Sequence, residues 1–429
     1  MQVSASARRA PWLVFLGCCV LSFLGFGVIV NTPGQYFSTL RSVFHVSQSA
    51  VALTVTVQML VGSLMLLVGG KILERYDSRK VLFLCVAVVA LSFLACSFVT
   101  AFWQFYLIFA IMGAAYAIPV LLAPQALLSN WFEKRLGMVM GIALGLSGLA
   151  GAIFQPIVVS WIGSLGWRGA YALTAVLFAL IALPFTLLLR FAPDAARGEV
   201  AFGHEEASQR LKTTAAVHQS AVNAQTATAD ATPRQAFRSW AFTFFVLSMV
   251  LLQIASGLVQ HVATFEKDMG LAPLAAASVV TGIMIGAAVG KGSIGALLDR
   301  FNATLVVLSY VAFGVAGWFI ILFVHAPGIA TVGGVLAGIG QGYLLVAIPW
   351  MIRQHFGASH YAQIYARAAL VSNVMLALST GFHGVLYDVT GKSYLLSFSL
   401  TLIGYALATV LGLVAFTHKR ARISPARTA

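Results

Sequence analysis

The chain contains long apolar runs that a membrane accommodates and water does not. Runs of about 20 residues, such as Trp12–Val30, Val81–Phe98 and Leu395–Phe416, recur from one end of the sequence to the other. A helix of that length crosses a hydrocarbon core of about 30 Å. Lipid-exposed backbone must form its hydrogen bonds within helices or a closed barrel. Barrel strands would show alternating polarity, which these runs lack, so we expect an all-α membrane protein.

The supply of charge excludes the main soluble alternatives. Charged residues make up 9% of the chain and hydrophobic residues 60%, against about 25% and 45–50% in soluble domains. A soluble enzyme, a nucleic-acid-binding domain and a disordered chain therefore all fit poorly. The net charge is +14, and the basic residues lie in short connecting loops. The four cysteines fall inside apolar runs, so we expect no disulfide framework.

The apolar runs predict twelve transmembrane helices in two groups of six. The first group is expected near residues 12–38, 47–73, 81–100, 103–130, 137–164 and 168–190. The second is expected near residues 238–264, 274–298, 303–324, 328–353, 360–387 and 394–417. A long polar stretch separates the two groups. We therefore predict an N-terminal six-helix bundle over 1–190, a cytoplasmic linker over 191–236 and a C-terminal six-helix bundle over 237–429.

The distribution of Lys and Arg predicts the orientation of these helices. With the N-terminus inside, the basic residues gather in the inner loops and the linker, and few fall in the outer loops. This is the asymmetry that the positive-inside rule describes. We therefore expect both termini in the cytoplasm and the protein in the cytoplasmic membrane of a bacterium.

A short motif recurs in corresponding places of the two halves. A glycine lies four residues before an acid–arginine pair at the end of the second predicted helix, and the same spacing recurs at the end of the eighth. Glycine allows helices to approach closely, and the charged pair can lock neighbouring helix ends. Chance charges at helix ends are the alternative. We interpret the repeat as a conformational-switch motif made of Gly70, Glu74, Arg75, Arg79, Gly295, Asp299 and Arg300.

Several stretches resemble known transporter sequences. Residues 70–80 resemble the signature loop of the major facilitator superfamily, with Glu74 for the usual Asp and Asp77 for a usual Gly. Residues 130–137, 166–168 and 388–391 are similar to motifs of monocarboxylate-transporter-like carriers. The resemblance covers nearly the whole chain. It implies a secondary transporter in which two six-helix bundles face a central cavity and rock between inward- and outward-open states.

The fifth predicted helix carries a ladder of glycines. Close packing between bundles that must shift is one interpretation, and static packing is the other. The ladder consists of Gly137, Gly141, Gly145, Gly148 and Gly151.

Two basic residues stand inside apolar runs. The 12 acids fall in loops or at helix ends, whereas Lys291 and Arg367 approach the midplane from the cytoplasmic side. A cation there costs at least about 2.5–3.5 kcal/mol and is normally functional. We expect both to hold the carboxylate of a small organic acid. Snorkelling is the alternative for Lys291, but it requires about 12 Å where a lysine reaches about 6 Å. An inner gate is the alternative for Arg367.

The resemblance adds to the interpretation of Lys291. In these carriers the eighth helix carries an arginine four residues before the repeat glycine, and Lys291 precedes Gly295 with this spacing. Ala287 stands where vertebrate-type carriers have an Asp for proton coupling. Ser372 and Ser147 stand where the oxalate–formate antiporter branch has a Lys and a Tyr. The resemblance therefore implies an organic anion other than oxalate, and it does not support proton coupling through that Asp.

Other polar residues fall at the depth expected for a cavity. Substrate contacts and interhelical hydrogen bonds are the two interpretations of Asn31, Thr32, Gln155, Tyr343 and Asn373. His261 resembles a histidine of bacterial relatives and is a candidate for proton coupling or an outer gate. A satisfied interfacial histidine is the alternative.

Motifs of other chemistry are missing from the sequence, which has no phosphate-binding glycine loop, no Cys/His metal spacing and no Ser/His/Asp constellation at one depth. We expect no enzymatic activity, no metal and no cofactor. We predict a monomeric secondary active transporter of a small organic anion, a monocarboxylate before others. It would work in the lipid bilayer by alternating access, as a proton symporter or anion exchanger, without nucleic acid. The alternatives are an exporter of amphipathic drugs and a non-transporting membrane sensor or scaffold.

Overall fold

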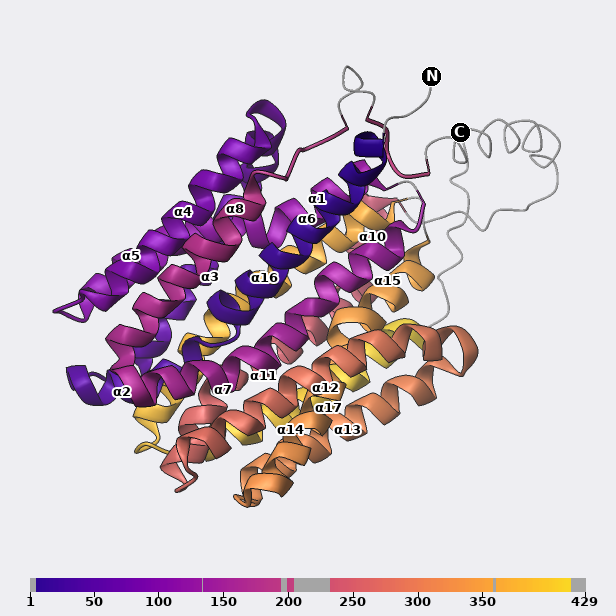
Figure 1. Ribbon diagram of the computed structural model, residues 1–429. Helices are drawn as coiled ribbons and strands as arrows, with labels where there is room; N and C mark the ends of the chain where they lie inside the picture. Colours follow the sequence, from indigo (N-terminus) through magenta and orange to yellow (C-terminus); the bar gives the residue numbers. More distant parts are fainter. Residues whose placement is uncertain (1–4, 133, 194–198, 204–231, 358–359, 418–429) are drawn as a thin grey trace.

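The computed structural model describes residues 5–132, 134–193, 199–203, 232–357 and 360–417, and these residues are almost entirely helical (Figure 1). Eleven helical segments among them are long and apolar enough to cross a membrane. One of the eleven, Met138–Thr186, contains two crossings, as shown below. The predicted all-α membrane fold is confirmed.

The first half of the chain supplies six crossings, some of them divided into several helices. These elements are α1 (Ala5–Leu24), η1 (Gly25–Val30), α2 (Pro33–Phe44), α3 (Gln48–Arg75), α4 (Ser78–Ser97), α5 (Trp103–Tyr116), η2 (Ala117–Leu122), α6 (Ala123–Trp131), α7 (Leu136–Leu177), η3 (Phe178–Ala182) and α8 (Leu183–Thr186).

The second half supplies the other six crossings, and Figure 1 shows it in colours from pink-red through orange to yellow beside the first half. Its elements are α10 (Pro233–Arg238), α11 (Trp240–Asp268), α12 (Pro273–Arg300), α13 (Ala303–Phe323), α14 (Pro327–Gly342), η5 (Tyr343–Ala347), α15 (Ile348–Phe356), α16 (Tyr361–Val389) and α17 (Leu395–Thr417).

The long helix α7 turns back at Gly166. This glycine has φ 70° and ψ 172°, a left-handed backbone that a residue without Cβ adopts at little cost. Beyond it, the Arg168 guanidinium donates to the carbonyl of Val99 (2.9 Å) and lies 4.2 Å from the ring centroid of Trp167. The turn is therefore held against the α4–α5 connection, and the chain returns as a separate crossing.

Proline explains where π-helical turns interrupt the α-helices of the crossings. Pro124, Pro184 and Pro349 each lie in the first turn of a helix that follows a π-helical segment. Proline lacks the backbone N–H and clashes with the carbonyl four residues earlier, so the preceding turn opens. Pro33 follows η1 in the same way after the break at Asn31 and Thr32. These breaks bend the helices around the centre of the molecule.

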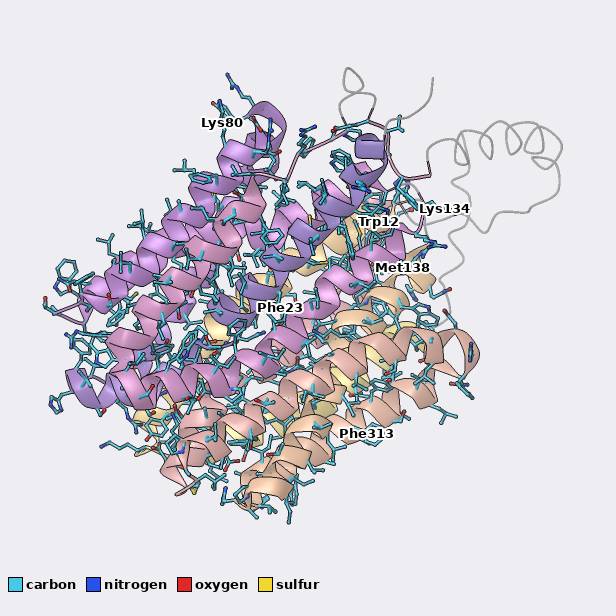
Figure 2. The ribbon with its side chains drawn as sticks, in the orientation of Figure 1. Trp12, Phe23, Lys80, Lys134, Met138 and Phe313 are labelled. Carbon is cyan, nitrogen blue, oxygen red and sulfur yellow. The ribbon has the colours of Figure 1, made fainter. Side chains whose placement is uncertain are left out.

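Two apolar cores hold the helices together. One gathers buried residues between Val14 and Leu189, and the other gathers residues between Ala236 and Ala415 together with Ala152. Large apolar side chains on the outer surface, such as Phe313 on α13 (Figure 2), are exposed as lipid-facing residues should be.

We name the two ends of the molecule by their connections. The linker end carries the α3–α4, α6–α7 and α12–α13 connections, and Lys80 and Lys134 lie there (Figure 2). The far end carries the α2–α3, α4–α5, α11–α12 and α16–α17 connections.

The predicted linker, 191–236, lies largely outside the described residues, but its described start packs on the first half. Phe202 forms a bridge with Phe132, in which the Phe202 N–H donates to Trp131 O (2.8 Å) and the Lys134 N–H to Phe202 O (3.0 Å). The Trp131 indole donates to Arg190 O (2.8 Å). These residues of the predicted linker are therefore anchored to the first half.

Candidate functional site

The two halves are joined at the far end by a carboxylate that caps a helix of the other half. Asp388, in the last turn of α16, accepts hydrogen bonds from the backbone N–H groups of Gln48 (3.1 Å) and Ser49 (2.8 Å). These residues begin α3, and N–H groups in a first helical turn have no partner within their own helix. A negative charge there also interacts favourably with the helix dipole. Asp388 thus ties α16 to α3.

An ion pair reinforces this closure. Arg41 of α2 pairs with Asp268 of α11 (3.1 Å) and donates to the hydroxyl of Tyr387 (2.8 Å), which in turn donates to Asp268 (3.0 Å). Lys267 donates to the hydroxyl of Ser38 (3.3 Å). These contacts cross between the two halves, and they were not predicted from the sequence.

His261 lies inside the closed end. Its side chain is fully buried. Its Nε2 lies 2.9 Å from Thr380 O, so Nε2 carries the proton, and Nδ1 accepts from the Gln48 amide (3.2 Å) and the Tyr394 hydroxyl (3.1 Å). The histidine is thereby neutral and satisfied, and its bond to Gln48 crosses between the halves. The bonding agrees with the alternative of a satisfied histidine, and the roles in proton coupling or an outer gate stay predictions.

We expect that Asp388→Ala shifts the carrier away from this conformation. Loss of a charged helix cap costs about 0.5–2 kcal/mol, which corresponds to a severalfold change in population. The measurement is the alkylation rate of Gly145→Cys, which faces open space on the linker side, in a background without the native cysteines. The rate should fall severalfold.

The matched control for Asp388 is Asn302. Its side chain caps α13 within one half, accepting from Thr304 and Leu305. Asn302→Ala should lower thermal stability and leave the alkylation rate unchanged. Equal rates in Asp388→Ala and the parent would contradict the role of Asp388 as a cross-bundle cap.

Helices α7 and α12 touch toward the far end and separate toward the linker end. A Cβ on Gly148 would lie 2.9 Å from Ala288 Cβ, and one on Gly151 would lie 2.8 Å from Met284 Cγ. One to two turns closer to the linker end, Cβ atoms on Gly141 and Gly145 would meet no heavy atom within 4 Å. The described residues thus leave an open cleft between the two helices at the linker end.

Lys291 lies where this cleft begins. It follows Ala288 by three residues and Met284 by seven, so it shares their α7-facing side of α12. Helical side chains lean toward the N-terminus of their helix, which for α12 is the far end, so Lys291 leans toward the closed end of the cleft. Its side chain is partly buried and has no hydrogen bond or ion pair with any residue that the structure describes.

Arg367 lies elsewhere. Its guanidinium stacks on the ring of Phe237 in α10, 4.0 Å from the ring centroid. It precedes Val385 by 18 residues, about five helical turns, so both lie on the same face of α16. Val385 faces a lateral groove and is half exposed. Arg367 therefore has an aromatic partner on another helix, and no contact joins it to Lys291 among the described residues.

A cluster of polar side chains joins α2, α7 and α11 around Asn31. The Gln155 amide donates to Asn31 O (2.5 Å) and its carbonyl accepts from Gln35 (2.5 Å). The Gln260 amide of α11 donates to Val30 O (2.8 Å) and its carbonyl accepts from the Gly34 N–H (3.1 Å). Gln155 therefore serves interhelical bonding. Gln35 and Gln260 were missed, although each is a glutamine within an apolar run.

The remaining predicted contacts divide between core and cleft. The Thr32 hydroxyl bonds Val28 O (2.7 Å) within its own chain segment. Tyr343 is fully buried and donates to Ala408 O of α17 (3.1 Å), so it packs inside the second half instead of lining the cleft. Asn373 is exposed on α16 and has no hydrogen bond with any residue that the structure describes.

The switch motif lies at the linker end. Arg79 donates to Asp77 through its N–H (3.0 Å) and guanidinium (3.4 Å). Slight burial opposes the effect, but these bonds hold the pKa of Asp77 below its ordinary value. The side chain of Glu74 lies outside the described residues. A Cβ on Gly70 would meet no heavy atom within 4 Å, and one on Gly295 would meet a single heavy atom at 3.9 Å. The second copy of the motif ends on the exposed Asp299 and Arg300.

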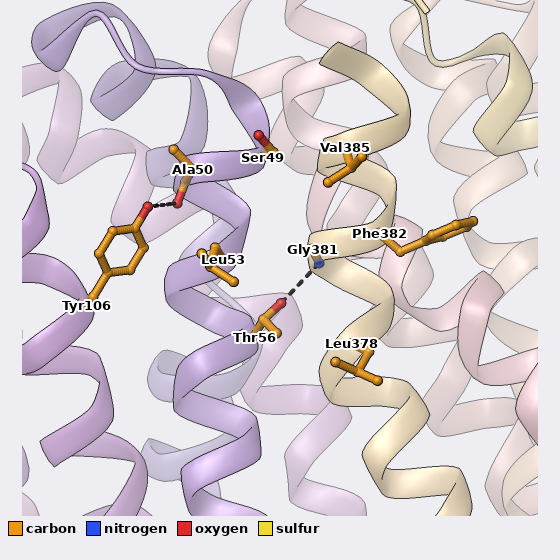
Figure 3. A pocket seen from close by; sticks show the side chains of 9 residues that line it. All are labelled: Ser49, Ala50, Leu53, Thr56, Tyr106, Leu378, Gly381, Phe382 and Val385. Carbon is orange, nitrogen blue, oxygen red and sulfur yellow. Dashed lines mark hydrogen bonds between the residues drawn. The ribbon is translucent and has the colours of Figure 1, made fainter. Parts of the chain in front are cut away.

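A lateral groove of about 580 Å³ lies between α3, α5 and α16 (Figure 3). Its polar groups are already bonded, since Tyr106 donates to Ala50 O (3.0 Å) and Gly381 to the Thr56 hydroxyl (3.1 Å). Four of its lining side chains are apolar and exposed, namely Leu53, Leu378, Phe382 and Val385. The groove follows the contact of the two halves on the outer surface and is separate from the cleft that holds Lys291.

Comparisons with known proteins agree with this architecture. The chain is 26% identical to the 3-(3-hydroxy-phenyl)propionate transporter of Escherichia coli over 75% of this chain and 76% of that protein. It is 27% identical to monocarboxylate transporter 13 of Bos taurus over 39% of each chain. It spans half or less of the length of the first curated relatives that it matches.

The fold matches a solved bacterial homologue of the human lysosomal transporter Spinster in an inward-facing, occupied conformation. The TM-score is 0.69 at 14% identity, over 96% of this chain and 97% of that chain. The family model described as the Major Facilitator Superfamily matches residues 15–290 and 262–429. The chain therefore belongs to the major facilitator superfamily, a superfamily of membrane transporters and not of enzymes.

Proposed function

We propose that the protein is a secondary active transporter of a small organic anion, with a monocarboxylate as the favoured candidate. The observation that carries this proposal is Lys291, a cation at the closed end of an open cleft with no partner among the described residues. A charge at this depth is costly and is normally functional. A carboxylate that arrives and leaves with each cycle would neutralise it.

The comparisons support this choice of substrate class. Two of the relatives, named above, carry names that refer to a monocarboxylate and to a substituted propionate. Other relatives and fold neighbours are named for riboflavin, xylose or nucleosides, so the superfamily alone does not choose. The unpaired cation of this chain favours the anionic substrates.

The charge distribution supports an orientation for this cycle. Lys and Arg are concentrated in the loops of the linker end, which the positive-inside rule places in the cytoplasm with both termini. The cleft would then be open inward, in the cytoplasmic membrane of a bacterium. One chain holds both bundles and the cleft, so a monomer suffices for transport.

The unpaired cation also favours a coupled mechanism. A carrier without substrate should change conformation slowly, because the unpaired positive charge would lose its contact with water as the cleft closes, which costs free energy. Exchange of one anion for another, or symport of an anion with a proton, keeps the centre neutral during closure. Free uniport would require the bare cation to cross the closed state.

Counterflow in proteoliposomes tests the proposed function. Vesicles loaded with unlabelled lactate or 3-phenylpropionate should accumulate the labelled acid transiently, whereas vesicles loaded with ethidium should not accumulate ethidium. Transport of ethidium without either acid would overturn the proposal in favour of a drug exporter. Binding of the acids without counterflow would favour a sensor.

A further inference from the structure

We infer that the substrate carries a hydroxyl group in addition to its carboxylate, and that Asn31 recognises this hydroxyl. The inference rests on the proposed function, because it concerns the same cleft. It follows from the way the side chain of Asn31 is held at the closed end of the cleft.

The orientation of the Asn31 carboxamide is fixed by its partners. Its Nδ2 donates to the backbone carbonyl of Ser147 on α7 (3.1 Å). A carbonyl accepts and cannot donate, so the amide nitrogen must face α7. The backbone carbonyl of Asn31 is held by Gln155 (2.5 Å). What remains is Oδ1, which has no hydrogen bond with any residue in the described part of the chain.

The position of Asn31 places this acceptor at the closed end of the cleft, toward which Lys291 leans. The carboxamide bonds Ser147 O, and its Nδ2 would lie 2.6 Å from a Cβ on Gly151, which Met284 Cγ also approaches to 2.8 Å. Lys291 lies seven residues beyond Met284, about 10 Å along the axis, and its side chain leans back toward Met284. Asn31 is partly exposed, whereas Thr32 beside it is buried. The acceptor and the Lys291 backbone thus lie about two helical turns apart along the cleft, and the lysine side chain shortens this gap.

The chemistry of this pair selects a bifunctional ligand. A carboxylate accepts from the Lys291 ammonium and would be repelled by a bare carbonyl oxygen. A hydroxyl donates to Oδ1, and an acceptor that a ligand desolvates without bonding is costly. A hydroxycarboxylate satisfies both groups at once. The corresponding acid without the hydroxyl satisfies one and buries the other unpaired.

Competition in the counterflow assay tests this inference. The probes are two pairs of acids that differ by one hydroxyl, lactate against propionate and 3-(3-hydroxyphenyl)propionate against 3-phenylpropionate. In the parent carrier, the hydroxylated member of at least one pair should compete roughly tenfold better. In Asn31→Ala this ratio should fall to about one, while the acid without a hydroxyl still competes.

The ratio is measured within each variant, so a change in the amount of folded carrier does not affect it. Asn31→Val keeps bulk without an acceptor and should give the same loss. The control Thr54→Val removes a buried hydroxyl committed to Val51 O (2.7 Å) and should keep the parent ratio. Equal competition within both pairs in the parent, or an unchanged ratio in Asn31→Ala, would overturn the inference. Failure of every acid to compete would instead overturn the proposed function.

Discussion

Lys291→Ala should lower the rate of carboxylate counterflow about 100-fold while leaving the protein folded. A hydrogen bond to a charged group contributes about 1.5–3 kcal/mol, and 1.4 kcal/mol is a factor of ten in binding. Because Lys291 has no partner among the described residues, its removal breaks no contact that the structure shows. The thermal stability of the empty carrier should therefore stay the same or rise, since a costly intramembrane charge is gone.

Thermal shift distinguishes this loss from unfolding. In the parent, a carboxylate at 100 times its dissociation constant should stabilise the carrier by about 2.7 kcal/mol, and in Lys291→Ala this stabilisation should disappear. Lys291→Arg keeps the charge and should keep part of the transport. The matched comparison is Arg367→Ala, which removes a cation that stacks on Phe237 of α10 and should reduce counterflow much less. Full counterflow by Lys291→Ala would exclude the proposed role of this residue.

The transmembrane helices could be predicted from the sequence because each crossing is recognised by its length and hydropathy. The turn at Gly166 illustrates the limit, since the predicted helices 137–164 and 168–190 lie within one continuous helical segment that this residue divides. The start of the linker differs from the prediction for another reason. Phe202 bonds to residues some 70 positions earlier, and polar composition carries no signal of such a partner.

The site was less predictable because depth in the membrane does not fix direction around a helix. Tyr343 and Asn31 were placed at cavity depth on equal grounds, yet Tyr343 faces α17 and Asn31 faces α7. Arg367 stacks on the ring of Phe237, a partner that the depth of Arg367 in the membrane does not reveal. The motif that contains Asp388 resembles one of monocarboxylate-transporter-like carriers. That resemblance does not predict the capping of α3, which is a contact across more than 300 residues.

Two substitutions in the α7 glycine ladder should trap the carrier in opposite states. At Gly148 a side chain enters the closed part of the seam, where its Cβ would lie 2.9 Å from Ala288 Cβ and 3.0 Å from Met284 O. At Gly145 a side chain enters open space and is tolerated in this conformation. In the alternate state the linker end must close, and a leucine at Gly145 would then stand between α7 and α12. Overpacking of this kind costs about 1–3 kcal/mol, a population shift of about 5–150-fold.

Gly148→Leu and Gly145→Leu should therefore both abolish counterflow and differ in accessibility. Ser38→Cys reports on the far end and Gly141→Cys on the linker end. Gly148→Leu should raise alkylation of Ser38→Cys and lower that of Gly141→Cys, and Gly145→Leu should do the reverse. If Gly148→Leu does not fold, Gly148→Ala, which adds one methyl group, should shift both rates in the same direction by less. A general loss of stability would move both variants alike, so opposite shifts can arise only if the seam between α7 and α12 closes alternately at its two ends.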